Sequence, residues 1–180
     1  MRTENQQELE NHIKACLTGE LESFRYIFDY TKERIFQYIL SRTSNREDSL
    51  DITQEIFVDI WKALPRFKYR SVGQFYGFIF LIARRRLIKY YRSRQSQVAL
   101  SEQHDDLPAE RDESDFNNYS DLLTSIKRLR KKHQEVLRLR YWSGLSYQEI
   151  GQVLGATETT VKVWHYRAIQ KLKKFLKDKI

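Results

Sequence analysis

Four carboxylates at helical spacing are the side chains in this sequence best suited to bind a metal ion or a basic partner. They are Asp48, Asp51, Glu55 and Asp59. Steps of three and four residues place them on one face of a helix, and oxygen ligands of this kind suit hard divalent cations. No histidine or second carboxylate helix completes such a metal site, and Lys62 continues the stripe, so a solvated helix face is favoured over a metal. A docking face for a protein partner, with Gln54 included, fits the same residues.

A run of nine basic residues and no acidic residue extends from position 66 to position 94 and contains aromatic side chains throughout. Cations neutralise phosphates, and aromatic rings stack on bases once a strand is opened. This combination therefore indicates single-stranded or melted DNA as a ligand. The rings that we expect in the core instead are Phe75, Phe78 and Phe80. For three tyrosine rings, stacking on bases and packing in the core are about equally favoured: Tyr69, Tyr90 and Tyr91.

The polar face of a helix near the C-terminus has the composition of a DNA recognition helix. Its residues are Thr159, Thr160, Lys162, Val163, Tyr166 and Arg167. They point away from an apolar stripe formed by Val161, Ala168 and Leu172, so they can reach base edges in a major groove, and arginine and lysine can also bind phosphate. A helical hairpin that packs on another protein is the alternative. His165 falls at a core spacing and is expected to be a packing residue.

No pattern of residues indicates a catalytic centre or a cofactor. The four histidines are scattered along the chain, no Gly-rich phosphate loop occurs, and Cys16 has no second cysteine with which to pair. We therefore expect a protein that is not an enzyme and needs no cofactor. A single cysteine, a polar N-terminus and the lack of an apolar run of roughly 20 residues predict a cytoplasmic protein that is not inserted in a membrane.

The elements that carry these residues are predicted to be helices. Only six glycines and two prolines occur among 180 residues, and 41% hydrophobic with 31% charged side chains is typical of a soluble globular chain. A helix from Asp51 to Leu64 presents the carboxylate stripe, buries a broad apolar face that includes Trp61, and stops at Pro65. A helix from Gln74 to Arg94 is apolar on all sides in its first half, so it should be the central helix of an N-terminal bundle.

An acidic segment separates two basic blocks. Residues 101–121 hold eight acidic side chains and one arginine, a net charge of −7, which leaves +15 on the remainder of a chain whose total is +8. Helical periodicity is also lost between residues 95 and 119. We predict two nucleic-acid-binding modules joined by a flexible linker that its own charge repulsion extends.

A helix-turn-helix is the most specific local pattern in the chain. Ser146 and Glu149 form a capping box that opens a short helix, and Gly155 ends it. Thr157 can cap the helix that follows. Two helices joined by a turn of about three to four residues with glycine form this DNA-binding motif.

Three segments together resemble bacterial RNA polymerase sigma factors. The segment DITQEIFVDIW, from Asp51 to Trp61, resembles the polymerase-binding helix of region 2.2. The segment FYGFIFLIARRRLIKYYRSR, from Phe75 to Arg94, resembles regions 2.3 and 2.4. Residues 134–172 resemble region 4. They occur in the family's order, with an acidic linker and no region 3 between them, which is the arrangement of the extracytoplasmic-function (ECF) type. The resemblance implies an all-α protein of two small helical domains, with region 2 in residues 1–95, the flexible acidic linker in 96–120 and region 4 in 121–180.

The resemblance also implies roles for particular side chains. Those that would dock on core RNA polymerase are Asp51, Gln54, Glu55 and Asp59. Those that would capture and hold the -10 element are Arg66, Lys68, Tyr69, Arg70, Ser71, Arg84, Arg85, Lys89 and Arg92. Those that would contact the -35 element are Thr157, Thr159, Thr160, Lys162, Val163, Tyr166 and Arg167. The implied partners are core polymerase, promoter DNA and an anti-sigma factor, with no metal and no small-molecule substrate.

Some positions depart from the usual family pattern. Tryptophan, asparagine and aspartate are usual where this chain has Phe78, Arg85 and Lys89, which makes that surface more basic and predicts an unusual promoter preference. The recognition helix also departs, at Val163, Trp164 and His165.

Two other functions fit parts of the sequence. An ordinary helix-turn-helix regulator would bind duplex DNA without core polymerase and would use the N-terminal module for dimerisation or sensing. A recombinase or nuclease would place Asp51, Glu55 and Asp59 on a metal and would cleave DNA only with magnesium or manganese. The three segments together favour a sigma factor that directs promoter-specific transcription initiation.

Overall fold

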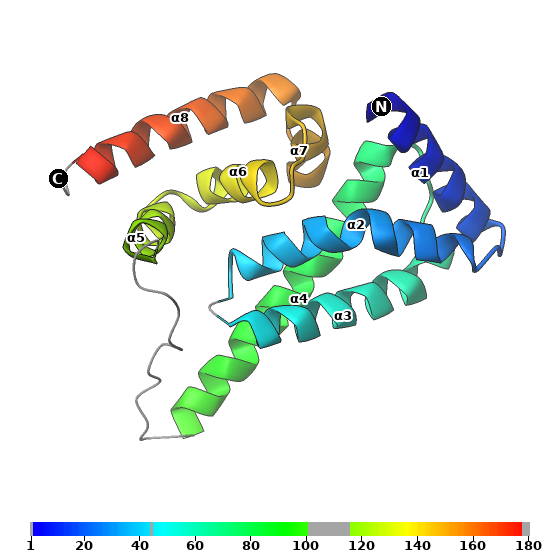
Figure 1. Ribbon diagram of the computed structural model, residues 1–180, viewed down its shortest axis with the longest axis horizontal. Helices are drawn as coiled ribbons and strands as arrows, with labels where there is room; N and C mark the ends of the chain where they lie inside the picture. Colours follow the sequence, from blue (N-terminus) through cyan, green and yellow to red (C-terminus); the bar gives the residue numbers. More distant parts are fainter. Residues whose placement is uncertain (1, 44, 101–115, 178–180) are drawn as a thin grey trace.

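The computed structural model describes residues 2–43, 45–100 and 116–177, and every regular element in that part of the chain is a helix (Figure 1). The predicted all-α fold class is therefore confirmed. The N-terminal elements are α1 (Arg2–Leu17), α2 (Ser23–Leu40), α3 (Arg46–Ala63), the 3-10 turn η1 (Leu64–Arg66) and α4 (Val72–Leu100). The C-terminal elements are α5 (Phe116–Lys127), α6 (Lys131–Tyr141), α7 (Tyr147–Leu154) and α8 (Glu158–Lys177). Within the described ranges, no helix has the length and apolar character needed to span a membrane.

Helices α1 to α4 form the N-terminal bundle. α2 and α3 lie side by side, α1 packs against α2, and α4 crosses α2 and α3 (Figure 1). The predicted 51–64 helix begins earlier, at Arg46, because Asn45 is extended and its side chain accepts a hydrogen bond from the Glu47 amide at 2.7 Å. It ends near the predicted position, since Pro65 follows in η1.

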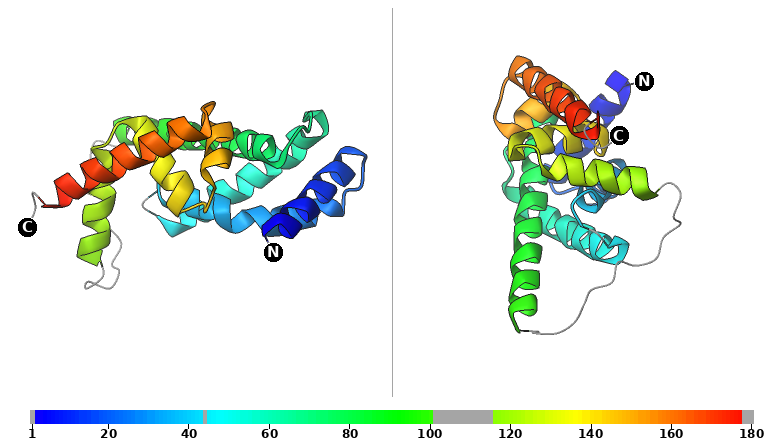
Figure 2. Two further views of the ribbon diagram at one scale, coloured as in Figure 1. Left: turned by 90° about the horizontal axis from the view of Figure 1, so that it is seen from above. Right: turned by 90° about the vertical axis from the view of Figure 1, so that its left-hand side faces the viewer.

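Helix α4 is longer than predicted and is covered on two sides. It begins at Val72, where the Ser71 hydroxyl accepts a hydrogen bond from the Gln74 amide at 3.1 Å, and it continues to Leu100. One side of the helix packs on α1, α2 and α3, and another side packs on α7, which lies against Gly73 and Gly77 in the first half of α4. These two contacts explain why apolar residues surround this part of the helix. The C-terminal end projects beyond the other helices (Figure 2).

The predicted linker of residues 96–120 is helical at both ends. α4 runs through it to Leu100, since no glycine or proline interrupts the helix after Gly77, and α5 begins at Phe116. Ile126 of α5 and Leu129 pack with Leu137 of α6 and Ala168 of α8 in a small apolar cluster. Residues 101–115 of the linker lie outside the described residues, so its flexibility stays a prediction.

The helix-turn-helix forms from α7 and α8 as predicted. Ser146 and Glu149 make the capping box: the Ser146 hydroxyl accepts from the Glu149 amide at 3.2 Å, and the Glu149 carboxylate accepts from the Ser146 amide at 2.7 Å. Gly155 ends α7 with a φ of 66°, in the left-handed region that glycine adopts without strain. Thr157 caps α8 by accepting a hydrogen bond from the Thr160 amide at 3.2 Å.

The two modules pack directly against each other, an arrangement that the sequence did not predict. α7 lies against α4, and one continuous cluster of buried apolar residues includes Tyr76 and Phe80 of α4 together with Leu145 and Ile150 of the C-terminal module. Glycine at position 77 lets the backbones approach, because a Cβ there would lie 3.2 Å from the carbonyl oxygen of Gln152. The contact between α4 and α7 thus sets the relative placement of the surfaces described next.

Candidate nucleic-acid and protein-binding surfaces

The predicted docking face on α3 is partly neutralised by an arginine from α4. Arg86 donates hydrogen bonds to the carboxylates of Glu55, at 2.7 Å, and Asp59, at 2.6 Å. These hydrogen bonds lower the pKa of Asp59 and raise the pKa of Arg86. Asp48 accepts a hydrogen bond from the Tyr90 hydroxyl at 2.7 Å, again from α4. α4 therefore holds three of the four carboxylates of the stripe, Asp48, Glu55 and Asp59.

Three apolar side chains are exposed next to the other predicted docking residues, Asp51 and Gln54. Leu50, Val58 and Trp61 have exposed fractions of 42%, 48% and 38%. Together with Gln54 they stand at positions 50, 54, 58 and 61, which are steps of four, four and three residues. The four side chains therefore share one face of α3. This spacing was visible in the sequence and could have identified a mixed acidic and apolar face.

The exposure of Trp61 corrects the predicted core of α3. Ile56 and Ile60 are fully buried on that face, as predicted, but Trp61 lies at its border. The indole packs edge to face on Phe24, with ring centroids 4.8 Å apart, and leaves its other side open. A large ring at the edge of a buried stripe can contact both the core and a partner.

Metal ligation has no geometric support in the described residues. No three His, Cys, Asp or Glu side chains there are grouped in a way that suits a metal ion. Glu55 and Asp59 share the guanidinium of Arg86 instead. In this arrangement an arginine supplies the positive charge that opposes the two carboxylates.

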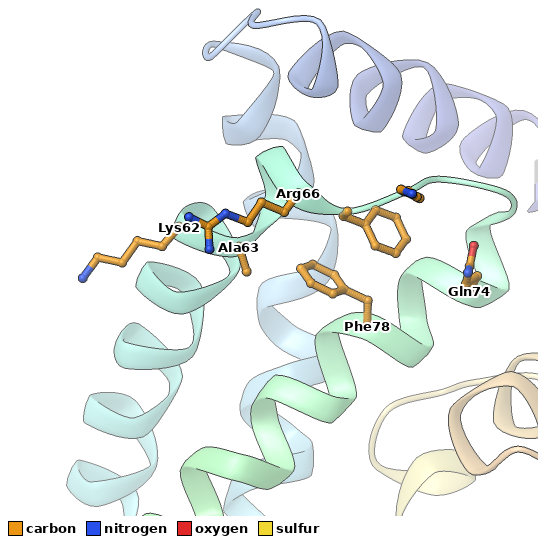
Figure 3. Close-up of a pocket in the computed structure, with 7 residues that line it drawn as sticks. Lys62, Ala63, Arg66, Gln74 and Phe78 are labelled. Carbon is orange, nitrogen blue, oxygen red and sulfur yellow. The ribbon is translucent and has the colours of Figure 1, made fainter.

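A pocket of about 480 Å³ opens between the end of α3, η1 and the start of α4 (Figure 3). Its lining residues are Lys62, Ala63, Arg66, Phe67, Lys68, Gln74 and Phe78. Phe67 and Phe78 are stacked with ring centroids 4.6 Å apart. Lys62 and Arg66 lie at the α3 and η1 side of the pocket, and their side chains run away from the ring of Phe78 (Figure 3). An aromatic wall with nearby cations can pack on a base and bind its phosphate. The volume is within the range of small-ligand sites.

The pocket contains residues that the sequence analysis did not assign to DNA binding. Arg66 and Lys68 belong to the predicted -10 set, whereas Lys62, Phe67 and Gln74 do not, and Phe78 was expected in the core. The pocket forms because the loop after η1 folds back over the first turns of α4. In the sequence, the one local feature that could have indicated this pocket is the alternation of aromatic and cationic residues in the loop.

Tyr69, predicted to be near the -10 element, does not line the pocket. Its ring lies under the ammonium group of Lys14 from α1, 5.6 Å from the ring centroid. Burial, with the nearby Glu10 carboxylate, raises the pKa of Tyr69 to about 12. Arg70 and Ser71, the next two predicted residues, are exposed, and Ser71 caps α4.

The basic surface of α4 divides into free and paired cations. Arg85, Lys89 and Arg92 are exposed on its second half. Arg84 is half-buried, and its Nε donates a hydrogen bond to Glu135 of α6 at 3.0 Å. Of the predicted cations on α4, three are therefore accessible and one is held by the C-terminal module.

The predicted -35 residues lie on the open side of α8. Thr157, Thr159, Lys162, Val163, Tyr166 and Arg167 are exposed, and Thr160 is half-buried. Val161, Ala168 and Leu172 are buried on the opposite side, as predicted. α8 is thus free along the face that a recognition helix turns to DNA.

His165 is a packing residue, as expected from its spacing. Its Nε2 lies 3.0 Å from the Tyr141 hydroxyl and its Nδ1 lies 3.3 Å from the Tyr147 hydroxyl. Burial, with a smaller effect of Arg140, lowers the pKa of this imidazole. The side chain ties α6 and α7 to α8.

Comparison with known proteins agrees with this division into two modules. Residues 27–97 match the family described as Sigma-70 region 2, and residues 119–172 match Sigma-70, region 4. The chain is 30% identical over 176 residues to the ECF RNA polymerase sigma factor ShbA of Streptomyces griseus, covering 89% of this chain and 91% of ShbA. It is 27% identical over 173 residues to the ECF RNA polymerase sigma factor BldN of Streptomyces coelicolor, covering 92% of this chain but only 65% of BldN.

A solved structure has the same fold. CnrH, in complex with the cytosolic domain of CnrY, superposes with a TM-score of 0.71 at 20% sequence identity, and the match covers 95% of this chain and 98% of CnrH. The likeness extends through both helical modules.

Proposed function

Because the chain belongs to the sigma-70 family of RNA polymerase sigma factors, as a member of its ECF group, we propose that it binds core RNA polymerase and directs it to promoters. The observation that carries this proposal is the presence, in one chain, of a cationic and aromatic pocket in region 2 and an exposed recognition helix in region 4. The first suits an opened strand, and the second suits duplex DNA.

The α3 face is the proposed contact with core polymerase. Asp51 and Gln54 are exposed there, and Arg86 holds Glu55 and Asp59 in fixed orientations. Leu50, Val58 and Trp61 add apolar surface to the same face. Polar groups around an apolar centre are typical of specific protein interfaces.

The pocket is the proposed site for a base of the -10 element. The stacked rings of Phe67 and Phe78 would pack on the base, while Arg66 and Lys68 would bind the backbone. Exposed cations on α4, namely Arg85, Lys89 and Arg92, would extend the phosphate contacts along the strand. The face of α8 from Thr157 to Arg167 would contact the -35 element.

The family assignment disfavours the two alternatives. An ordinary regulator needs only the helix-turn-helix, whereas both sigma regions match here. We propose that the chain has no catalytic activity of its own, needs no cofactor and acts in the cytoplasm, where core polymerase is found. An anti-sigma factor is a proposed partner, supported by the fact that CnrH was solved in complex with a second protein.

Reconstitution tests the function directly. The purified chain is mixed with bacterial core polymerase and a library of promoter fragments, and run-off transcripts are sequenced. We expect transcripts that require the chain and that begin downstream of a shared pair of elements. Core polymerase alone is the control. Tight, promoter-specific retardation of DNA by the chain alone, with no chain-dependent transcript, would instead support the ordinary-regulator hypothesis.

A further inference from the structure

The exposed face of α8 is apolar along its centre. Thr159, Val163 and Tyr166 follow one another at steps of four and three residues, so they form a row along one side of the helix. Val163 comes two residues after the buried Val161, and two residues are a little more than half a turn. The row therefore points away from the core, while α6 and α7 pack on the other side of α8 (Figure 1).

Two side chains of this row leave large apolar surface open to water. Val163 and Tyr166 have exposed fractions of 42% and 65%. Burying such surface against a ligand is favourable in proportion to the apolar area that is removed from water. A ligand that matches the row must therefore present apolar groups to the middle of the helix.

Cations flank the apolar row on both sides. Lys162 precedes Val163 by one residue and Arg167 follows Tyr166 by one residue, and all four side chains are exposed. One residue is a step of about 100° around a helix, so the two cations lie on opposite flanks of the row. Positive flanks and an apolar centre suit a DNA groove, where phosphates line both edges and bases form the floor.

Lys162 is held on its flank by neighbouring side chains. Its Nζ lies 2.7 Å from a carboxylate oxygen of Glu158, one turn earlier on α8. The same ammonium group lies over the ring of Tyr147 from α7, 6.0 Å from the ring centroid. These contacts keep Lys162 on the α7 side of the row and leave the centre of the face to Val163 and Tyr166.

The methyl group of thymine is the ligand that fits the apolar centre. In the major groove this C5-methyl is the apolar group that a base pair presents, whereas guanine is read by arginine or lysine. Val163 and Tyr166 are three residues apart, a rise of about 4.5 Å along α8, and successive base pairs are about 3.4 Å apart. The two side chains can therefore meet thymines of neighbouring base pairs.

We propose, on the basis of the function proposed above, that Val163 and Tyr166 determine the specificity for the -35 element. They pack on the 5-methyl groups of thymines in two adjacent A·T pairs. The cations on the flanks bind phosphate and position the helix, which by itself carries no sequence information. Promoters of this chain thus share two adjacent A·T pairs opposite the middle of α8.

Replacing thymine with deoxyuridine tests the proposal, because it removes the methyl group and keeps the base pair. The probe is a promoter fragment that the wild-type holoenzyme selects from the library, with each -35 thymine replaced singly. Competition binding measures the affinity of the holoenzyme for each fragment. We expect a loss of about three- to fivefold at two neighbouring positions, the effect of burying one methyl group. Deoxyuridine in the spacer between the -35 and -10 elements is the control and should change nothing.

Variants of α8 connect this loss to particular side chains. Val163→Ala and Tyr166→Ala should each weaken binding of the thymine fragment and abolish the deoxyuridine effect at one of the two positions. Tyr166→Phe should retain the effect, because the ring remains. Lys162→Ala should weaken the thymine and deoxyuridine fragments by the same factor, as loss of a phosphate contact does. Circular dichroism checks that each variant remains helical.

The outcomes separate this proposal from the proposed function. Three results would overturn thymine recognition: a selected -35 element without adjacent A·T pairs, equal affinity for thymine and deoxyuridine fragments, or a deoxyuridine effect that both alanine variants retain. Wild-type promoter affinity in both alanine variants would also overturn it and would indicate that the row binds a protein. If wild-type protein directs no transcription with core polymerase, the sigma-factor function itself fails.

Discussion

Arg86 changes what the carboxylates of α3 can do. Its guanidinium spans Glu55 and Asp59, so these two side chains serve the packing of α4 on α3 as well as any partner. Asp51 is exposed on the same helix and is not one of the two residues that Arg86 holds. Residues of one acidic stripe therefore differ in how much of their charge is available to core polymerase.

Substitutions at Asp51 and Asp59 separate docking on core polymerase from the packing of α4 on α3. We expect Asp51→Lys to weaken co-purification with core polymerase while leaving the free energy of unfolding nearly unchanged, because its side chain is exposed. Asp59→Ala should lower the free energy of unfolding by about 1 kcal/mol, since it breaks a partly exposed ion pair. Pull-down and urea denaturation measure the two effects. Wild-type binding by Asp51→Lys would show that α3 is not the docking face.

Two histidines should make the stability of the chain depend on pH. Burial lowers the pKa of His133 and of His165 in the folded state. Above the ordinary imidazole value of about 6.5, both are neutral in the folded and unfolded chains and add no pH dependence. As the pH falls below that value, the unfolded chain takes up protons first, so stability decreases until the lowered values are reached.

The expected result is a lower urea midpoint at pH 5 than at pH 7, with a smaller difference in His165→Gln. The matched control is His12→Gln, in α1 and outside the region 4 packing of His133 and His165. If His165→Gln and the wild type lose the same stability between these pH values, the imidazole at 165 is not responsible.

At the scale of elements, the loop after α3 and the recognition helix α8 present different chemistry. The loop stacks Phe67 on Phe78 of α4, beside the cations Arg66 and Lys68. In contrast, α8 presents hydroxyls and cations along one exposed face. The first arrangement needs an unpaired base, and the second needs an intact groove. The two elements should therefore act at different steps of initiation.

Alanine substitutions distinguish the two steps. Lys68→Ala should leave closed-complex binding largely intact but lower the permanganate reactivity of -10 thymines. Arg167→Ala should weaken promoter recruitment, by about 1–3 kcal/mol at one base pair if it contacts a base edge. Lys32→Ala, on exposed α2 surface, is the control. Equal losses of binding and of strand opening in both variants would contradict the division.

The turn of the helix-turn-helix depends on a glycine inside α7. A Cβ on Gly151 would lie 2.5 Å from the carbonyl oxygen of Ala156, an atom of the turn backbone that cannot move aside easily. We expect Gly151→Ala to lower the free energy of unfolding by about 1–3 kcal/mol. Gln148→Ala, at an exposed position in the same helix, should have little effect. Urea denaturation followed by circular dichroism compares the two, and equal stabilities would contradict the predicted clash.

At the scale of the whole molecule, the shared core makes the two modules depend on each other. Buried residues of α4 and of the C-terminal module belong to one cluster, and Glu135 links α6 to α2 and α4. Separation of the modules therefore exposes apolar surface and unpairs buried charge. Such coupling favours a single cooperative transition.

Tryptophan fluorescence can test this coupling. Trp61 reports on region 2 and Trp164 on region 4. Each single-tryptophan variant retains Trp61 or Trp164 and carries phenylalanine at the other two tryptophan positions. We expect both variants to show the same urea midpoint, once the stability change of each variant, measured by circular dichroism, has been corrected for. Adding Glu135→Gln should separate the two midpoints. Two distinct transitions in the presence of Glu135 would show that the modules unfold independently.

The local features of this protein follow from its sequence because they depend on neighbours in the chain. The capping box of Ser146 and Glu149, the glycine end of α7 and the buried stripe of α8 require only short-range hydrogen bonds and helical period. The stop at Pro65 and the acidic stripe of α3 have the same origin. Three segments of the sequence, occurring in the family's order, also resembled the sigma family.

Tertiary structure decided the features that join distant parts of the chain. The pairing of Arg86 with Glu55 and Asp59, the aromatic wall of the pocket, and the contact of Glu135 with region 2 connect residues from different helices. No helical period specifies which exposed charge of one helix meets which charge of another. Their partners depend on how the helices cross, and here two glycines in α4 let α7 approach closely enough to close the two modules on each other.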